Sequence, residues 1–384
     1  MNIAKKKIIR ATTIPRSLNA FCNGMLRELS DKYEVVAVSS PDKELKEVAE
    51  REGVRTIGVH MERRISVMKD VKSLFQMLKV FKNEKPTMVH SMTPKAGLIC
   101  MMAAKFCGVP VRVHTFTGLV WPTETGLKRR ILMATDWLTC ACATHIIPEG
   151  QGVLNDLRNG GITKKQMRVL GHGNVRGVDM EYYKRTPEII HASDSIKRAD
   201  RFTFIFVGRI VNDKGISELV LAFKRLLSVH PETRLILVGP YENDHDPISS
   251  EIQKEIDSIE QIEVVGPKFG EALLPYYAAS DCFVFPSYRE GFPNTVMEAG
   301  AMDLPSIVTD INGSREIIEN GVNGIIIPSK DTNSLYNAMC TMIENVELRH
   351  NMASVSREMI GKRFEKGFVR KCLYDYYDEI LKDC

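Results

Sequence analysis

Residues 282–300 read CFVFPSYREGFPNTVMEAG, and this stretch decides the fold class. The apolar run before Pro286 is typical of a buried parallel strand. The residues after Pro293 favour a helix, so the stretch predicts a strand, a loop and a helix in succession. Glu290 then lies in the loop at the carboxyl end of the strand, where open α/β sheets bind ligands, and Glu298 lies about one turn into the helix.

Strand-like and helix-like segments alternate along most of the chain, which predicts mostly parallel sheets with helices on both faces. In the first half the expected strands are Lys7–Thr12, Val35–Ser39, Thr56–Val59, Met88–Ser91, Val111–Phe116, His145–Pro148 and Met167–Leu170. The expected helices between them are Leu18–Leu29, Lys43–Arg51, Val67–Lys82, Lys95–Phe106 and Gly126–Ala141. A polar stretch from Tyr183 to Arg201 is expected to be a linker.

The alternation resumes after this stretch. The expected strands are Phe202–Gly208, Leu235–Gly239, Glu263–Gly266, Asp281–Pro286, Ser306–Thr309 and Gly324–Ile327, with helices beginning near Gly215, Gly270, Asn294, Ser314 and Thr332. A chain of 384 residues suits two domains. We therefore expect two doubly wound, Rossmann-like domains facing a cleft. The first takes residues 1–183, with an amphipathic helix at 368–384 crossing back to it, and the second takes residues 184–367.

The composition is that of a soluble globular protein, with 44% hydrophobic and 26% charged residues. The nine cysteines form no CxxC pair and lie mostly in apolar segments, which indicates reduced core thiols in a cytosolic protein. Cys140 and Cys142 are close in sequence, but no further His or Cys cluster completes a metal site. The first ten residues lack a signal-peptide pattern, and no stretch reaches the ~18 uncharged apolar residues of a spanning helix. A protein that is neither secreted nor integral to the membrane is expected.

The two halves of the chain differ in charge. Residues 1–180 hold 29 Lys and Arg against 16 Asp and Glu, whereas the remainder holds 23 against 32. A basic half indicates an anionic partner for the first domain. A membrane surface, a phosphorylated substrate and a nucleic acid all fit, although no RRM, KH or helix-turn-helix pattern supports the last.

A second segment, residues 204–215, reads FIFVGRIVNDKG and carries two cations at the end of a strand. Arg209 follows the strand directly, and Lys214 precedes a helix. A guanidinium and an ammonium group both suit phosphate oxygens. Solvated surface residues are the plain alternative for these cations, and equally for Glu290 and Glu298 taken alone.

The combination of these cations with the two glutamates about 80 residues later resembles the retaining, nucleotide-sugar-dependent glycosyltransferases of family 4, which have the GT-B fold. The segments 311–318 (INGSREII) and 320–324 (NGVNG) also match, and the resemblance covers essentially the whole chain. It implies that Arg209 and Lys214 neutralise the donor diphosphate as the sugar leaves and that Glu290 faces the transferred sugar. Neither a metal nor another cofactor is expected.

The same resemblance implies the rest of the donor site. Glu298 binds the ribose hydroxyls, and the N–H groups of Asn294 and Thr295 hold a phosphate oxygen. The further donor-binding residues are Gly208, Phe292 and Gly266, the last in a segment where backbone groups read the base.

The chain departs from the family pattern at three places. Asp303 stands where the family often has glycine, so the turn there is expected to differ. The first loop lacks the glycine pair of many members and offers Arg16 instead. Thr117 occupies the position at which many members carry a histidine, and His114 points to the opposite face of its strand.

Residues 89–97 (VHSMTPKAG) and 108–119 (GVPVRVHTFTGL) resemble a subgroup that extends polyprenyl-diphosphate-linked sugars in bacterial capsule, O-antigen and glycoprotein assembly. The acceptor-side candidates are Arg16, Lys95, His114, Thr117, Gly118 and His172. The plain alternatives for Arg16, Lys95 and His114 are, respectively, a loop cation, a helix-start lysine and a histidine satisfied within the core.

Lysines accompany an apolar series in the segment 67–85, which is typical of a basic amphipathic helix on anionic lipid. Packing of that apolar series on the sheet is the alternative. We therefore expect a peripheral protein on the cytoplasmic face of the plasma membrane. Its expected activity is transfer of a sugar from a nucleotide-sugar, with UDP favoured, to a lipid-linked saccharide. A family 4 enzyme with a soluble acceptor and a GT-B sugar-nucleotide epimerase or hydrolase are the alternatives.

Overall fold

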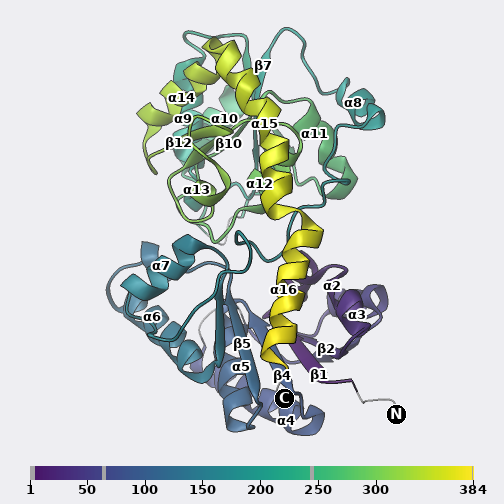
Figure 1. Ribbon diagram of the computed structural model, residues 1–384. Coiled ribbons are helices and arrows are strands. Elements are labelled where there is room, and N and C mark those ends of the chain that lie inside the picture. Colours follow the sequence, from purple (N-terminus) through teal and green to yellow (C-terminus); the bar gives the residue numbers. More distant parts are fainter. Residues whose placement is uncertain (1–4, 63–65, 243–245, 383) are drawn as a thin grey trace. The chain divides into compact units, whose positions relative to one another are not determined.

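The computed structural model describes residues 5–62, 66–242, 246–382 and 384 (Figure 1). The chain forms two compact units, which are described separately: unit 1 takes residues 1–177 and 367–384, and unit 2 takes residues 178–366. The expected division lay six residues later, at 183. The difference arises because Val178 pairs with Glu365, and its N–H donates to the carbonyl of Phe364 at 2.8 Å.

Unit 1 contains a parallel sheet with the strand order β3-β2-β1-β4-β5-β6. Its strands are β1 (Lys7–Ala11), β2 (Glu34–Ser39), β3 (Arg55–Gly58), β4 (Met88–Met92), β5 (Val111–Phe116) and β6 (His145–Pro148). The seventh expected strand, Met167–Leu170, is wrong. Met167 makes a single bridge to Ile146, and the chain then turns through Gly171 at a φ of 55°.

Helices cover both faces of this sheet (Figure 1). They are α1 (Pro15–Cys22), α2 (Met25–Ser30), α3 (Lys43–Glu52), α4 (Val67–Glu84), α5 (Pro94–Phe106), α6 (Gly126–Cys142), α7 (Gln151–Asn159) and α16 (Lys366–Ile380), with a 3-10 turn η1 (Trp121–Thr123). The single helix expected over 18–29 is split into α1 and α2. Gly24 lies between them at a φ of 74°, a left-handed conformation that interrupts a helix.

The end of the chain completes the core of unit 1. Leu373, Tyr376 and Tyr377 of α16 are buried among side chains of α1, α2 and the sheet. Arg370 adds an ion pair with Glu28. The expectation that the last helix belongs to the first domain is therefore confirmed.

Unit 2 contains a second parallel sheet, with the order β12-β11-β10-β7-β8-β9. Its strands are β7 (Phe202–Val207), β8 (Thr233–Val238), β9 (Ile262–Gly266), β10 (Cys282–Phe285), β11 (Ser306–Thr309) and β12 (Gly324–Ile327). The central strands β11, β10, β7 and β8 are almost wholly buried, as their continuous apolar runs require, whereas the edge strands β9 and β12 are partly exposed. The expected fold class, two doubly wound Rossmann-like α/β domains, is confirmed.

The helices of unit 2 follow the expected alternation with one exception. They are α8 (Pro187–Ser193), α9 (Ile216–Leu226), α10 (Ser250–Ser258), α11 (Leu274–Ala278), α12 (Asn294–Ala301), α13 (Ser314–Ile317), α14 (Thr332–Glu344) and α15 (Val346–Phe364), with 3-10 turns η2 (Asn212–Lys214) and η3 (Gly270–Ala272). The expected linker at 183–201 contains α8 and is part of unit 2. Thr186 caps this helix by accepting from the N–H of Ile189, and Pro187 starts it.

Two expectations about composition can be compared with the structure. All nine cysteines are free thiols, and only Cys384 is exposed. Within the described ranges no helix has both the length and the apolar character needed to cross a membrane.

Candidate functional site

The topology of unit 2 brings the predicted donor residues to one edge of its sheet. Strand β7, the first of this unit, lies between β8 and β10 in the sheet. The chain adds β8 and β9 on one side of β7 and then β10, β11 and β12 on its other side, so the strand order reverses between β7 and β10. Loops diverge at such a switch point and leave a crevice at the carboxyl ends of the strands. Arg209 follows β7 and Glu290 follows β10, so the two strands that flank the switch point supply both residues.

Lys214 and Glu290 form an ion pair in this crevice. Their side chains are only 12% and 18% exposed, and Ser287 Oγ donates to the same Glu290 oxygen at 2.9 Å. The Lys214 ammonium also lies 5.6 Å from the centre of the Phe285 ring. Because both charges are largely removed from water, each is stabilised chiefly by the other.

Arg209 lies beside this pair. Its guanidinium donates to Glu242 Oε2 at 2.7 Å and lies 4.0 Å from Asp213 Oδ1. Burial lowers the pKa of Arg209, but nearby carboxylates outweigh that effect and raise it above its ordinary value. Glu242 contributes most of the increase, and Glu290 is among the contributors, so Arg209 and Glu290 are electrostatic neighbours.

Two glycines allow the loops at this edge to pack closely. A Cβ on Gly215 would lie 2.1 Å from the carbonyl oxygen of Pro286, and its φ is 69°. A Cβ on Gly239 would lie 1.8 Å from the carbonyl oxygen of Gly208, at a φ of 152°. No larger residue fits at either position. These close approaches therefore fix the backbone next to Arg209 and Lys214.

Glu298 projects from α12, the helix that the opening motif predicts. Its side chain is buried, and the Tyr277 hydroxyl donates to Oε2 at 3.3 Å. Asn294 and Thr295 form the first turn of the same helix, where N–H groups point out of the helix end and favour an anion. The helix therefore presents an anion-binding end and, one turn later, a carboxylate.

The remaining predicted donor positions are Phe292, Gly266 and Gly208. The ring of Phe292 packs against Phe364, with centroids 5.3 Å apart, and is 5% exposed. The ring therefore belongs to the core, and the donor contact expected at Phe292 stays a prediction. Gly266 ends β9 at a φ of 70°, and Gly208 donates to the carbonyl of Val238 at 3.0 Å.

Asp303 stands in a left-handed turn. Its φ is 59°, a conformation that Asp tolerates better than most residues. The expected difference from the family's turn stays a prediction.

Tyr182 was missed by sequence reasoning. Its hydroxyl would lie 3.6 Å from a Cβ on Gly270. Burial, followed by the carboxylates of Glu271 and Glu298, raises the pKa of Tyr182. The residue thus lies near Glu298 although the two are far apart in sequence, and no motif marks it.

Unit 1 has its own switch point, between β1 and β4. The loops after these strands meet there, and the hydroxyls of Thr13 and Thr93 are 2.7 Å apart. Thr93 has a φ of 71°, which is strained for a β-branched residue. Arg16 lies in the first turn of α1 next to this junction, with its side chain exposed.

The other acceptor-side candidates fall into two groups. Thr117 and Gly118 follow β5 and are half-buried, while His172 is exposed beside the Phe368 ring. Lys95 and His114 are instead tied into the structure. Lys95 donates to Asp70 at 2.6 Å and is 10% exposed, which joins the starts of α5 and α4.

His114 is buried, lies 2.9 Å from Ser91 Oγ through Nδ1, and packs on Gly97. Burial lowers its pKa to about 3, so it is neutral. Its predicted role as an acceptor contact is corrected to that of a core histidine, because its ring has no open side.

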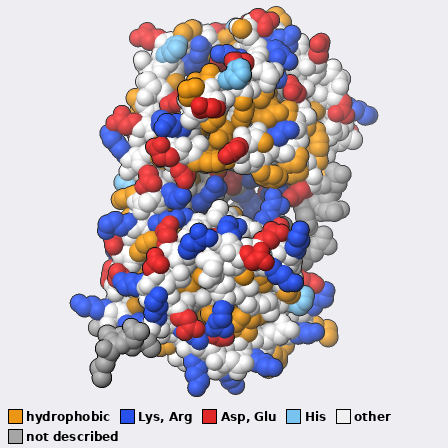
Figure 2. Space-filling view, turned by 90° about the vertical axis from the view of Figure 1, so that its right-hand side faces the viewer, with side chains coloured by type: hydrophobic (Ala, Val, Ile, Leu, Met, Phe, Trp, Pro, Cys, Tyr) orange, Lys and Arg blue, Asp and Glu red, His pale blue; other side chains and the backbone are white. Residues whose placement is uncertain are grey.

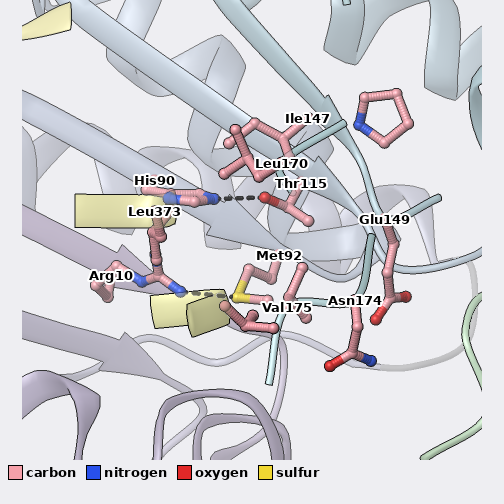
Figure 3. A pocket seen from close by; sticks show the side chains of 12 residues that line it. Arg10, His90, Met92, Thr115, Ile147, Glu149, Leu170, Asn174, Val175 and Leu373 are labelled. Atoms are coloured by element: carbon pink, nitrogen blue, oxygen red, sulfur yellow. Dashed lines mark hydrogen bonds between the residues drawn. The ribbon is translucent and has the colours of Figure 1, made fainter. Parts of the chain in front are cut away.

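A pocket at the carboxyl edge of the unit 1 sheet contains groups that the sequence did not single out (Figure 3). Arg10, fully buried, donates to Nδ1 of His90 at 2.7 Å, so Nε2 of His90 carries the proton and donates to Thr115 at 2.7 Å. Across the pocket lie Glu149 and Asn174. The volume is about 20 Å³, enough for one water molecule. These hydrogen bonds join side chains of β1, β4 and β5, and the pocket is too small for a sugar.

Comparison with known proteins agrees with this geometry. The Glycosyl transferase 4-like domain matches residues 18–173, and the Glycosyl transferases group 1 family matches residues 189–359. The capsular polysaccharide biosynthesis glycosyltransferase CapM of Staphylococcus aureus is 30% identical over 380 residues, which cover 98% of either chain. The chain belongs to glycosyltransferase family 4. This membership confirms the resemblance and makes the protein a transferase.

Two further relatives extend the comparison. The UDP-Gal:alpha-D-GlcNAc-diphosphoundecaprenol alpha-1,3-galactosyltransferase of Escherichia coli is 27% identical over 294 residues, covering 74% of this glycosyltransferase and 73% of that protein. The structure of HepE from Anabaena in complex with UDP superposes with a TM-score of 0.81 at 17% identity, covering 97% of this chain and 100% of that one. At this identity the superposition shows a shared GT-B fold.

Proposed function

We propose that this glycosyltransferase transfers a sugar, with retention of configuration, from a UDP-linked donor to a polyprenyl-diphosphate-linked saccharide in the assembly of a bacterial surface polysaccharide or glycan. The observation that carries the proposal is the largely buried Lys214–Glu290 ion pair beside Arg209 at the switch point of unit 2. The name of the Escherichia coli relative, which specifies a UDP-linked donor and a diphosphoundecaprenol-linked acceptor, supports these substrate classes.

In the proposed mechanism, the acceptor hydroxyl attacks the anomeric carbon from the face that the diphosphate leaves. The new glycosidic bond forms as the bond to the phosphate oxygen breaks, and that oxygen keeps the electron pair and takes the acceptor's proton. Arg209 and Lys214 stabilise the negative charge that develops, which is the work that a metal ion does in other enzymes. Glu290 contacts the transferred sugar, and the α12 end holds a phosphate oxygen while Glu298 accepts from ribose hydroxyls.

We further propose that the protein works at the cytoplasmic face of the plasma membrane, because its acceptor is anchored there, and that it needs no metal. A soluble acceptor and an epimerase or hydrolase activity are the competing functions. The undecaprenol-linked substrate named for the relative favours the lipid acceptor over both.

The donor assignment is tested by thermal shift against UDP-galactose, UDP-glucose, UDP-N-acetylglucosamine and GDP-mannose, each with and without EDTA. We expect one or two UDP-sugars to raise the melting temperature whether or not EDTA is present, and Glu298→Ala to lose most of that increase. Glu347→Ala, which changes an exposed glutamate of α15, is the control. A panel in which no donor stabilises the unchanged protein would contradict the proposal. Transfer of labelled sugar into an organic-extractable lipid then separates a lipid acceptor from a soluble one.

A further inference from the structure

A histidine, a cysteine and a glutamate converge at the surface of unit 2. A ring nitrogen of His230, the sulfur of Cys340 and a carboxylate oxygen of Glu344 all lie within 4.8 Å of one another. Within residues 5–62, 66–242, 246–382 and 384, no other three His, Cys, Asp or Glu side chains come together in this way. Imidazole, thiolate and carboxylate groups are the ligands of zinc in proteins. The cluster therefore has the chemistry of a zinc site.

The topology of unit 2 explains why these residues meet. Cys340 and Glu344 are four positions apart on α14, a spacing that places two ligands on one side of a helix. His230 lies in the turn between α9 and β8, and α14 packs against α9 (Figure 1). In a parallel α/β sheet, the start of β8 and the end of α14 both lie at the amino edge. The donor residues Arg209 and Glu290 lie at the other edge.

The backbone around this cluster is held in place by the fold. The N–H of His230 donates to the carbonyl of Leu226 at 2.8 Å, and the hydroxyl of Thr233 donates to the carbonyl of His230 at 2.8 Å. Arg225 of α9 ties the two helices together, because its guanidinium lies 3.9 Å from the centre of the Tyr336 ring of α14. Ligands that are positioned in advance lose little conformational freedom when an ion binds.

The distances between the ligand atoms are close to those that a zinc ion requires. Nε2 of His230 lies 3.0 Å from Oε1 of Glu344. Two ligands of a tetrahedral zinc ion, at bond lengths of ~2.0–2.3 Å, lie roughly 3.3–3.6 Å apart, so an ion can replace the shared proton after a small movement. The half-buried sulfur of Cys340 has to move by about 1 Å to complete the set. The Glu344 side chain is 62% exposed and is therefore able to adjust.

The other nitrogen of His230 faces a second carboxylate. Nδ1 lies 3.6 Å from Oε1 of Glu232, whose side chain is 55% exposed. A histidine that binds a metal through one nitrogen almost always donates its other N–H to a carboxylate, a backbone carbonyl or water, which fixes the ring and raises its basicity. A small rotation of Glu232 brings it within hydrogen-bond distance. The cluster thus supplies three ligands and an outer partner for one of them.

A surface histidine elsewhere in unit 2 shows the difference. Figure 2 shows the side of unit 2 that bears α8 and α11, where histidines lie at the surface among charged side chains. His191 of α8 lies 3.5 Å from Asp194, and its side chain is 91% exposed. In the described part of the chain this pair belongs to no group of three ligands. Two ligands on exposed side chains are fewer than a zinc site needs.

We infer that unit 2 binds one zinc ion through His230, Cys340 and Glu344, with water as the fourth ligand, and that the ion fastens the α9–β8 turn to the end of α14. Cys340 binds as the thiolate and releases its proton to the solvent, so binding strengthens as the pH rises. A thiolate and an imidazole select zinc over magnesium and calcium, which prefer oxygen ligands. Because the ion lies at the edge opposite the donor crevice, it stabilises unit 2 and takes no part in the proposed sugar transfer.

Cobalt reports on these ligands directly. The reduced full chain is freed of metal with EDTA, exchanged into buffer and titrated with Co²⁺ without oxygen. We expect one equivalent to produce the visible bands of tetrahedral cobalt and a thiolate-to-cobalt charge-transfer band in the near ultraviolet. Zn²⁺ should displace the cobalt and remove both signals, whereas an excess of Mg²⁺ should leave them unchanged.

Variants assign the signals to residues. C340S should abolish the charge-transfer band and weaken Zn²⁺ binding by more than ~100-fold, and E232Q should keep the band and weaken binding ~10-fold, as the loss of an outer partner does. C384S, which changes an exposed thiol, and H191N should bind as the unchanged protein does. E344Q changes an exposed side chain, so it tests the site even if C340S folds poorly.

A second measurement follows stability. Zn²⁺ at a ~100-fold excess over its dissociation constant should raise the melting temperature by about 5 °C or more. E344Q should lose most of this increase, and its response to UDP-sugars should match that of the unchanged protein.

The outcomes decide the inference independently of the proposed function. It is overturned if Co²⁺ produces no charge-transfer band, if the band survives in C340S, or if C384S removes it. Binding of several equivalents that none of the variants changes would show adventitious surface binding and would overturn it too. If zinc binds as expected and no UDP-sugar does, the zinc site stands and the proposed function fails. If only the UDP-sugar binds, the reverse holds.

Discussion

Replacing Lys214 by methionine removes one charge from the crevice and keeps most of the side-chain volume. The ammonium group pairs with Glu290, and the two side chains are 12% and 18% exposed. At an effective dielectric constant of ~20, two unit charges ~4 Å apart interact by ~4 kcal/mol. Loss of a comparable attraction to the leaving diphosphate should lower kcat about 10²–10³-fold, or ~2.7–4 kcal/mol.

The same substitution should also lower stability, because Glu290 is left with Ser287 as its hydrogen-bond donor in a site with little water. The measurements are kcat and KM for the UDP-sugar that the thermal-shift panel identifies, together with the melting temperature. The double variant K214M/E290Q should recover much of the lost stability and none of the lost activity. That divergence would show that the loss of activity does not come from the loss of stability.

Lys224 provides the matched control. It pairs with Glu255 at 2.7 Å, but its side chain is 54% exposed, so K224M removes an equivalent contact in water. Such surface pairs contribute ~1 kcal/mol or less, and kcat should not change. The reasoning is refuted if K214M keeps kcat within fivefold of the unchanged enzyme, or if K224M lowers it as much.

Three further predictions follow from contacts described above. Glu298→Gln should weaken UDP binding at least tenfold in calorimetry, whereas Tyr277→Phe should change it less than threefold; equal losses would show that Glu298 acts through the fold. Gly239→Ala should lower the melting temperature by several degrees, because its Cβ would lie 1.8 Å from the Gly208 carbonyl oxygen and a backbone atom cannot yield cheaply; an unchanged denaturation midpoint would refute this crowding. Unfolding at a series of pH values should show stability falling below pH ~6.5, and His114 should contribute up to ~1.4 kcal/mol per unit to that fall, because its pKa is about 3 in the folded chain and the unfolded chain takes up the proton first. His114→Gln should reduce that slope, although burial lowers the pKa of His90 as well and keeps part of it; an identical slope in the variant would exclude His114 as a source.

The sequence predicts the layered fold well because the information is local. Runs such as 204–207 and 282–285 are apolar throughout, which only a strand buried on both faces explains. The expectations failed where a short segment depends on distant partners. Met167 finds only Ile146 to pair with, and Thr186 caps a helix in a stretch whose composition is typical of a linker.

The candidate site was predictable in part for a similar reason. Arg209, Lys214 and Glu290 were found because each follows a strand, and strands of a doubly wound sheet end at a common edge. Glu242, which neutralises Arg209, and Tyr182, beside Glu298, were missed because only the tertiary fold brings them there. Burial decides the case of His114, which carries suitable chemistry but is enclosed in the core.

The position of α16 has a consequence for how the polypeptide is made. Most of unit 1 precedes unit 2 in the chain, yet Tyr377 and Leu381 are part of its core. During synthesis, roughly 200 residues separate the end of its first segment from those side chains, a delay of about 10–40 s at bacterial rates. Unit 1 must wait through this interval with an unfilled hydrophobic groove, because its core needs side chains that are translated after the whole of unit 2. Chaperones therefore have a longer opportunity to act on unit 1 than on unit 2.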